Sequence, residues 1–177
     1  MKTLLKTSLL AFALAMALAA CGNTPISVPL DDFSIDIGTV TDTANKVIYS
    51  KQPASFAKAY VAKTINITGK LTYTAVAGSN TLNITFYASA SDPKNHTGCN
   101  AIGEIYICDP SGEKAISKPS SFTKDQAAPI TLGDPNSEVL AEGINNGQIW
   151  IGALVTESLS INTKFSFSNM VAHVTIF

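Results

Sequence analysis

The segment from Thr64 to Ala90 alternates apolar and polar side chains. In its first half, apolar and polar residues fall on opposite parities: Ile65, Ile67, Leu71 and Tyr73 against Thr64, Asn66, Thr68, Lys70, Thr72 and Thr74. The alternation resumes with Leu82, Ile84, Phe86, Ala88 and Ala90 against Thr81, Asn83, Thr85 and Ser89. Successive side chains of a strand point to opposite faces, so each half predicts a strand with one buried face. With a turn at residues 77–80, the pattern predicts one long β-hairpin that covers a core.

Weaker patterns predict further strands along the chain. Short alternating or apolar runs lie at residues 33–37, 47–50, 102–108 and 130–132. Residues 148–156 are apolar on both parities, which is typical of a central strand covered on both faces. Residues 161–177 alternate twice with a change of parity, and a bulge or tight turn near Ser168-Asn169 would explain the change. Residues 111–128 predict a long loop or a weak edge strand, and residues 53–62 fit a strand or a helix.

One short helix is predicted after Asp134. An aspartate caps free backbone amides, Pro135 suits a first helical position, and Gly143 is placed to end the helix. The following Asn146-Gly147 pair predicts a turn.

Roughly eight or nine strands separated by turns favour an all-β fold, an antiparallel β-sandwich with one short helix. A lipocalin-like β-barrel is the alternative, although the Gly-x-Trp sequence of that family is absent near the first strand. The length of the chain fits one domain with a substantial core, which we place at residues 32–177.

The N-terminus has the pattern of a targeting segment. Lys2 and Lys6 precede an apolar run, Thr7 to Leu18, that is short for a membrane span. The run ends in Leu18-Ala19-Ala20-Cys21, which resembles the lipobox of bacterial lipoproteins. An ordinary secretory signal is the alternative interpretation.

The resemblance implies that residues 1–20 are a signal peptide and that Cys21 is lipidated. Residues 22–30 contain two prolines and small polar residues, which predict a tether, so we assign residues 21–31 to the lipidated cysteine and tether. Cys21 would carry a diacylglyceryl thioether, with fatty acids such as palmitate, and often an N-terminal acyl group. Two or more acyl chains hold a protein at a membrane stably. Because residue 22 is Gly and not Asp, the sorting rule of enteric bacteria implies the outer membrane, or the outer face of the cytoplasmic membrane where no outer membrane exists. We therefore expect a cell-envelope protein with the membrane as a partner.

The charge of the chain argues against nucleic acid as a partner. Cleavage after residue 20 would remove Lys2 and Lys6 and change the formal net charge from −1 to −3. Every basic residue is lysine, so the bidentate fork that arginine offers to phosphate is absent. A weakly acidic surface with no basic run is not typical of a nucleic-acid-binding protein.

Cys99 and Cys108 are the two cysteines outside the lipobox. Export would send them to a compartment that permits disulfides, so we expect them to pair. Closing so short a loop should contribute roughly 2.5–3 kcal/mol on the chain-entropy model. A metal site that includes His96 is the alternative, although the cysteine spacing is long for a zinc pair.

Two weaker site predictions concern ligands. Asp109 and Glu113 lie in an acidic loop of the kind that holds Ca²⁺ at the end of a sandwich. The alternative is that Asp109, which precedes a proline, only forms part of a turn. No other cofactor is expected. Tyr87 and Tyr106 fall on the polar parity of their strands and are candidates for binding a sugar or another ligand, with cross-strand packing as the alternative.

These observations favour a lipid-anchored, non-catalytic envelope protein that binds a protein or glycan partner or has a structural role. The alternative is a carbohydrate- or small-ligand-binding β-sandwich. A hydrolase is the third hypothesis, and we do not expect an enzyme, because no motif supplies a nucleophile with a base. A pocket that places His96 or His173 beside a carboxylate would favour the hydrolase.

Overall fold

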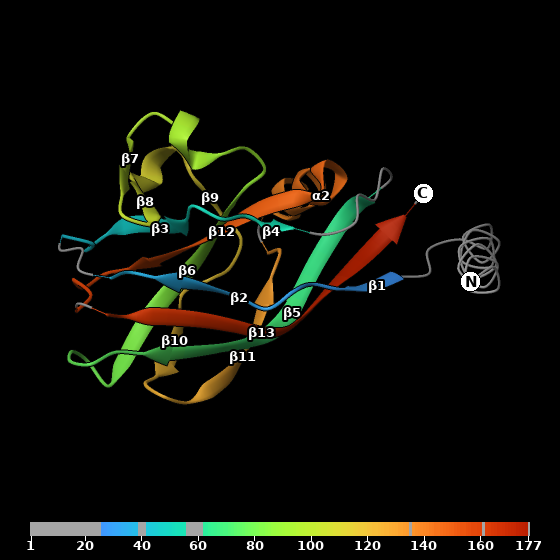
Figure 1. Ribbon diagram of the computed structural model, residues 1–177. Helices are drawn as coiled ribbons and strands as arrows, with labels where there is room; N and C mark the ends of the chain where they lie inside the picture. The colour runs from blue at the N-terminus through green and yellow to red at the C-terminus, as the bar shows by residue number, and fades with distance from the viewer. Residues whose placement is uncertain (1–25, 39–41, 56–61, 135, 161, 177) are drawn as a thin grey trace, which may run out of the picture.

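The computed structural model describes residues 26–38, 42–55, 62–134, 136–160 and 162–176. The predicted signal peptide and Cys21 lie outside these ranges. These ranges form two curled antiparallel sheets that pack face to face, together with one α-helix, which confirms the predicted β-sandwich (Figure 1). Within the described ranges, no helix has both the length and the apolar character needed to cross a membrane.

The first sheet contains five strands and the second contains eight. In spatial order, the first sheet contains β1 (Ile26–Pro29), β13 (Lys164–Ile176), β5 (Ala62–Thr74) and β11 (Ala127–Leu132), while β2 (Phe33–Asp36) also pairs with β13. The second contains β10 (Ser120–Thr123), β6 (Thr81–Ser89), β12 (Gln148–Val155), β3 (Lys46–Ser50), β8 (Ile105–Cys108) and β7 (Cys99–Ile102). Two short strands complete it: β4 (Ala54–Ser55) pairs with β12, and β9 (Lys114–Ala115) pairs with β6.

The main core lies between the sheets. Aromatic contacts join its two sides: the Phe167 ring of the first sheet stacks on Phe33 at 4.4 Å and meets Phe86 of the second sheet edge-on at 5.8 Å. Phe86 in turn meets Phe122 edge-on at 5.9 Å. These rings fill the space that the alternating strands leave between their buried faces.

The strands predicted within Thr64–Ala90 form, but the predicted hairpin is wrong. β5 lies between β13 and β11 in the first sheet, whereas β6 lies between β10 and β12 in the second. The chain therefore crosses the sandwich between them. Ile67 and Ile84 are fully buried in the same core, because the apolar faces of β5 and β6 pack against each other across the sandwich instead of lying side by side in one sheet. Alternation specifies a buried face, and either arrangement satisfies it.

The parity change in the last strand is a β-bulge, as predicted. The register of β13 against β5 shifts between Ser168 and Val171, and Asn169 adopts a positive φ of 52°. Gly69 on β5 provides the room for this irregularity: a Cβ there would lie 2.2 Å from the Sδ of Met170. Met170 can thus remain buried on the core side of the bulge.

The predicted helix is present with different ends. Helix α2 covers Ser137–Asn146, and Gly147, at φ 78°, ends it in the left-handed conformation. Gly143, the predicted stop, lies inside the helix because α2 packs closely on β12: a Cβ at Gly143 would lie 2.9 Å from the side chain of Ile149. The glycine that ends the helix is therefore the one predicted for the next turn.

The structure also corrects the predictions around the second sheet. The strand predicted at residues 102–108 is a hairpin of β7 and β8, and residues 111–128 carry β9 and the edge strand β10. The ambiguous segment at residues 53–62 contributes β4, and residues 56–61 lie outside the described ranges. At the N-terminus, Ile26–Pro29 pair with β13, so the last part of the predicted tether belongs to the domain.

Candidate functional site

A second apolar cluster covers the outer face of the second sheet, and we call it the outer cluster. Its buried members are Val47, Tyr49, Tyr106, Cys108 and Trp150, with Tyr87, Cys99 and Leu154 packed against them. The cluster explains why the central strand β12 is apolar on both parities. Of the two predicted ligand-binding tyrosines, Tyr106 is only 7% exposed and Tyr87 is half-buried. Both rings therefore pack in this cluster, and their ligand-binding role stays a prediction.

The segment between β6 and β9 carries His96 and contributes Tyr106 and Cys108 to the outer cluster. Asp92 caps the short helix η1 (Pro93–Asn95) by accepting a hydrogen bond from the Lys94 amide, and its carboxylate pairs with the Lys94 ammonium at 3.0 Å. Burial raises the pKa of Asp92, but the hydrogen bonds from Lys94 outweigh it, so the net pKa is lowered. The backbone amide of His96 then donates to Pro93 O at 3.0 Å. These contacts fix the position of the His96 backbone, from which its side chain extends.

A disulfide joins Cys99 to Cys108, as predicted. The two residues lie directly opposite each other on β7 and β8. The bond holds the β7–β8 hairpin, and the segment that carries His96 enters this hairpin at Cys99. A second short helix, η2 (Pro110–Gly112), follows β8 and leads to Glu113.

Glu113 is a buried carboxylate with two side-chain partners. Its side chain is 2% exposed, and it accepts a hydrogen bond from the Tyr49 hydroxyl at 2.7 Å on Oε2. His96 Nδ1 lies 2.9 Å from Oε1. Burial, followed by the nearby Glu113 charge, raises the pKa of Tyr49 and of Tyr87. Glu113 thus joins the strand residue Tyr49 to His96 through its two carboxylate oxygens.

The other ring nitrogen of His96 faces two serines at the end of β6. The Oγ of Ser91 lies 2.9 Å from Nε2, and the Oγ of Ser89 lies 3.2 Å from it. Ala88, Ser89, Ala90, Ser91, His96, Gly112, Glu113, Lys114, Val139 and Glu142 line a cavity of about 190 Å³, the His96 pocket. The structure therefore has a pocket with a histidine beside a carboxylate, the arrangement that would favour a hydrolase.

The predicted calcium ligands do not meet in this geometry. Asp109 forms an ion pair with Lys46, whereas Glu113 faces His96 and Tyr49. Among the described residues, the group that brings three potential metal-ligand side chains within 4.8 Å is His96, Cys99 and Glu113. Cys99 is in a disulfide and has no thiolate, so the oxidised protein offers one nitrogen and one carboxylate there. Binding of Ca²⁺ stays a prediction.

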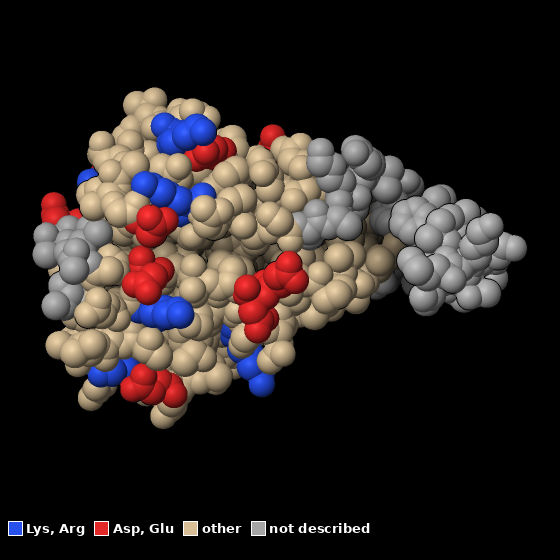
Figure 2. Space-filling model, in the orientation of Figure 1, with Lys and Arg blue, Asp and Glu red and all other residues tan. Residues whose placement is uncertain are grey.

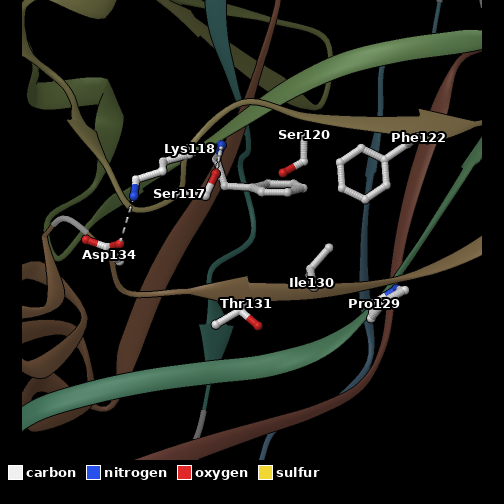
Figure 3. A pocket seen from close by; sticks show the side chains of 9 residues that line it. Ser117, Lys118, Ser120, Phe122, Pro129, Ile130, Thr131 and Asp134 are labelled. Atoms are coloured by element: carbon white, nitrogen blue, oxygen red, sulfur yellow. Dashed lines mark hydrogen bonds and ion pairs between the residues drawn. The ribbon is translucent and has the colours of Figure 1, made fainter.

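A larger cavity of about 340 Å³ opens between β10 and β11, where the edges of the two sheets diverge (Figure 3). We call it the edge pocket. Its lining comprises Phe86, Ser117, Lys118, Ser120, Phe122, Pro129, Ile130, Thr131 and Asp134. Figure 3 shows the side chains of β10 and those of β11 on opposite sides of the pocket. Its volume falls in the range of roughly 300–1,000 Å³ that small-molecule sites occupy.

The edge pocket has an apolar interior and a polar rim without net charge. Phe86, Phe122 and Ile130 are each at most 6% exposed and form the interior. At the rim, the ammonium of Lys118 lies 3.7 Å from the carboxylate of Asp134, and both side chains are about four-fifths exposed. Each charge offsets the other. Acidic and basic groups are likewise interspersed on the face of the molecule in Figure 2, most of which carries neither sign.

The second histidine has a different setting. His173 lies on β13 with Nε2 3.0 Å from the Thr68 hydroxyl and Nδ1 3.2 Å from the Ser27 hydroxyl. Its hydrogen-bonding partners are thus neutral side chains of the neighbouring strands β5 and β1.

Comparisons with known proteins give a distant structural likeness. No family model matches the sequence, and no curated protein matches it either. Among solved structures, the chain is similar to the CBM22-1 xylan-binding domain of Xyn10C from Paenibacillus barcinonensis. The identity is 9% and the TM-score 0.39, over 88% of this chain and 97% of that domain. The likeness is too distant to bear on function.

The site residues predicted from the sequence do not include Ser91, Tyr49 or the lining of the edge pocket. Ser91 continues the parity of Ser89 just before the Asp92-Pro93 turn, which was the available signal that both serines face the returning segment. The edge pocket has no local signal, because its two sides come from strands of different sheets.

Proposed function

We propose that this protein is a lipid-anchored β-sandwich of the cell envelope that binds a neutral, sugar-like ligand in the edge pocket. The observation that carries the binding proposal is the chemistry of this pocket, whose apolar interior is bordered by Ser117, Ser120 and Thr131. Sugars present apolar C–H faces and a rim of hydroxyl groups, so they match a site with both kinds of lining.

The charges at the rim favour a neutral ligand over an ionic one. Lys118 and Asp134 compensate each other, so neither an anion nor a cation meets an uncompensated partner there. The absence of arginine in the chain removes the side chain best suited to hold a phosphate or carboxylate. A neutral ligand with hydroxyl groups can instead exchange hydrogen bonds with serine, threonine and the ion pair.

Steric block of the pocket tests this proposal. Ser120 lines the pocket, and Ser121, the next residue on β10, points away from it and bonds Asn83 at 2.5 Å. A glycan array identifies a ligand, and isothermal titration calorimetry compares Ser120→Phe with the matched control Ser121→Phe. We expect the first variant to lose binding at least tenfold and the second to retain it. Absence of any glycan ligand, or equal affinity of both variants, would refute the proposal.

The membrane anchor rests on the lipobox and has its own test. Cys21→Ser removes the sulfur that the thioether requires, so the variant should carry no lipid. Mass spectrometry of the wild-type protein should find acyl chains on Cys21 as the first residue, and the variant should leave the membrane fraction or remain as an uncleaved precursor. An unmodified Cys21 in the wild-type protein would disprove the anchor.

A further inference from the structure

The His96 pocket contains a continuous chain of hydrogen bonds from a serine through a histidine to a buried carboxylate. Ser91 Oγ lies 2.9 Å from His96 Nε2, and His96 Nδ1 lies 2.9 Å from Glu113 Oε1. A nucleophile in contact with a base, and that base oriented by a third group, is the geometry that activates a serine for acyl transfer.

The surrounding hydrogen bonds determine which atom donates and which accepts in each hydrogen bond of this series. An ionised carboxylate only accepts, and Glu113 already accepts from Tyr49, so His96 Nδ1 donates to it. Neutral His96 then presents an unprotonated Nε2. The Ser89 hydroxyl donates to Ser91 O at 2.6 Å, which leaves the hydroxyl of Ser91 to donate to Nε2.

Solvent exposure decreases from the serine through the histidine to the carboxylate, as activation of a serine for acyl transfer requires. Ser91 is exposed, the side chain of His96 is 22% exposed, and that of Glu113 is 2% exposed. A substrate can therefore reach the hydroxyl, while the carboxylate is shielded from competing water. Tyr49 holds the second oxygen of Glu113 and fixes its orientation toward the histidine. Lys114 and Glu142 also line this cavity, with charges of opposite sign.

We infer that Ser91, His96 and Glu113 form a catalytic site that hydrolyses small carboxylic esters. Ser91 Oγ bonds to the ester carbonyl carbon as its proton passes to His96 Nε2. The tetrahedral intermediate then breaks the bond from the carbonyl carbon to the alcohol oxygen, and the departing alcohol takes the proton from Nε2. Water attacks the acyl-serine and gives its proton to Nε2, and collapse of the second intermediate returns that proton to Ser91 and releases the carboxylic acid.

The size of the pocket limits the acyl group. A cavity of about 190 Å³ is below the range of roughly 300–1,000 Å³ that drug-sized ligands occupy, so we expect short acyl chains. Esters are preferred over amides because an alcohol leaves more readily than an amine. In this site Ser91 and His96 are catalytic residues, and Glu113 is a positioning residue.

Hydrolysis of p-nitrophenyl acetate, together with fluorophosphonate labelling followed by peptide mass spectrometry, tests the site in the full-length protein. The wild-type protein should hydrolyse the ester and be labelled on Ser91. Ser91→Ala and His96→Gln should each lower kcat at least a hundredfold, in the range found for removal of an acid–base group. Ser111→Ala, an exposed serine on η2, should match the wild-type protein.

Glu113→Gln separates positioning from folding. This variant should lower kcat about tenfold or more and leave KM unchanged. A purely structural role would instead lower the melting temperature and leave kcat of the folded protein unchanged. Wild-type hydrolysis that persists in Ser91→Ala, or a wild-type protein that neither hydrolyses the ester nor reacts at Ser91, would overturn the inference. Ser120→Phe, which blocks the edge pocket, should leave hydrolysis unchanged, so failure of one proposal is distinguishable from failure of the other.

Discussion

The ring of Tyr49 lies over Gly152, its direct neighbour across strands β3 and β12, in the space that a side chain at residue 152 would occupy. A Cβ at Gly152 would lie 2.6 Å from Tyr49 Cε1 and 2.9 Å from a methyl of Val47. From this position the Tyr49 hydroxyl reaches Glu113 at 2.7 Å. A glycine in the central strand thus sets the position of the carboxylate in the His96 pocket.

We expect Gly152→Ala to destabilise the protein by about 1–3 kcal/mol, the usual cost of overpacking a core. Tyr49 is fully buried, so its ring cannot move into solvent without opening the outer cluster. Gly112→Ala is the control, because a Cβ at Gly112 meets no atom within 4 Å. Urea unfolding of both variants checks the prediction, and equal midpoints would contradict it.

The one-sided burial of β5 predicts different effects at two positions of this strand. Ile67 is fully buried in the core, whereas Thr64 is exposed on the same strand. Ile67→Asp would bury an unpaired carboxylate, which costs several kcal/mol against a total stability of roughly 5–15 kcal/mol, so this variant should fail to fold. Thr64→Asp should fold normally. Circular dichroism and soluble yield distinguish them, and a similar loss in both would contradict the burial pattern.

Removal of the disulfide should loosen the segment that carries His96. Cys99 and Cys108 are nine residues apart, and we expect the double variant Cys99→Ala, Cys108→Ala to lose about 2–4 kcal/mol of stability. Hydrogen exchange should rise first in residues 92–113, because this segment contains the hairpin that the disulfide closes. Free thiols on both cysteines of the oxidised wild-type protein would contradict the prediction.

Two tyrosines with raised pKa values predict a loss of stability at alkaline pH. Burial, followed by the Glu113 charge, raises the pKa of Tyr49 and Tyr87 above the value of about 10 in an unfolded chain. A raised pKa in the folded state means that the contribution of these groups is complete below about pH 10 and is lost as the pH rises further. Urea midpoints should therefore fall above about pH 10 and fall less steeply in Tyr49→Phe. An unchanged slope in that variant would exclude Tyr49 as a source.

Alternation in the sequence predicted which residues are buried better than it predicted which strands pair. Ile67 and Ile84 are buried as expected, yet β5 and β6 belong to different sheets. Side-chain parity reports a face of a strand, whereas pairing depends on its edges and on distant partners such as β13 and β12. The bulge near Asn169 was predictable because it changes parity locally.

The candidate sites were less predictable because their residues meet only through tertiary structure. The disulfide followed from the number of cysteines and the expected compartment. Glu113 drew attention as a calcium ligand, but its contact with His96 depends on the turn after β8 and on the pairing of β9 with β6. In the sequence, Tyr49 has the pattern of an ordinary strand residue. Only the tertiary structure brings Gly152 and Glu113 beside it.

If Cys21 carries lipid as proposed, the pairing of β1 with β13 would limit how far the domain can rise from a membrane. Cys21 precedes the first paired residue, Ile26, by five positions, which span at most about 17 Å when fully extended. With lipid on Cys21 as proposed, the end of the sandwich where β1 begins would face the bilayer, and the β7 hairpin, at the other end in Figure 1, would point away from it. The domain would then work within a thin layer above the lipid headgroups, reaching only molecules that enter this layer.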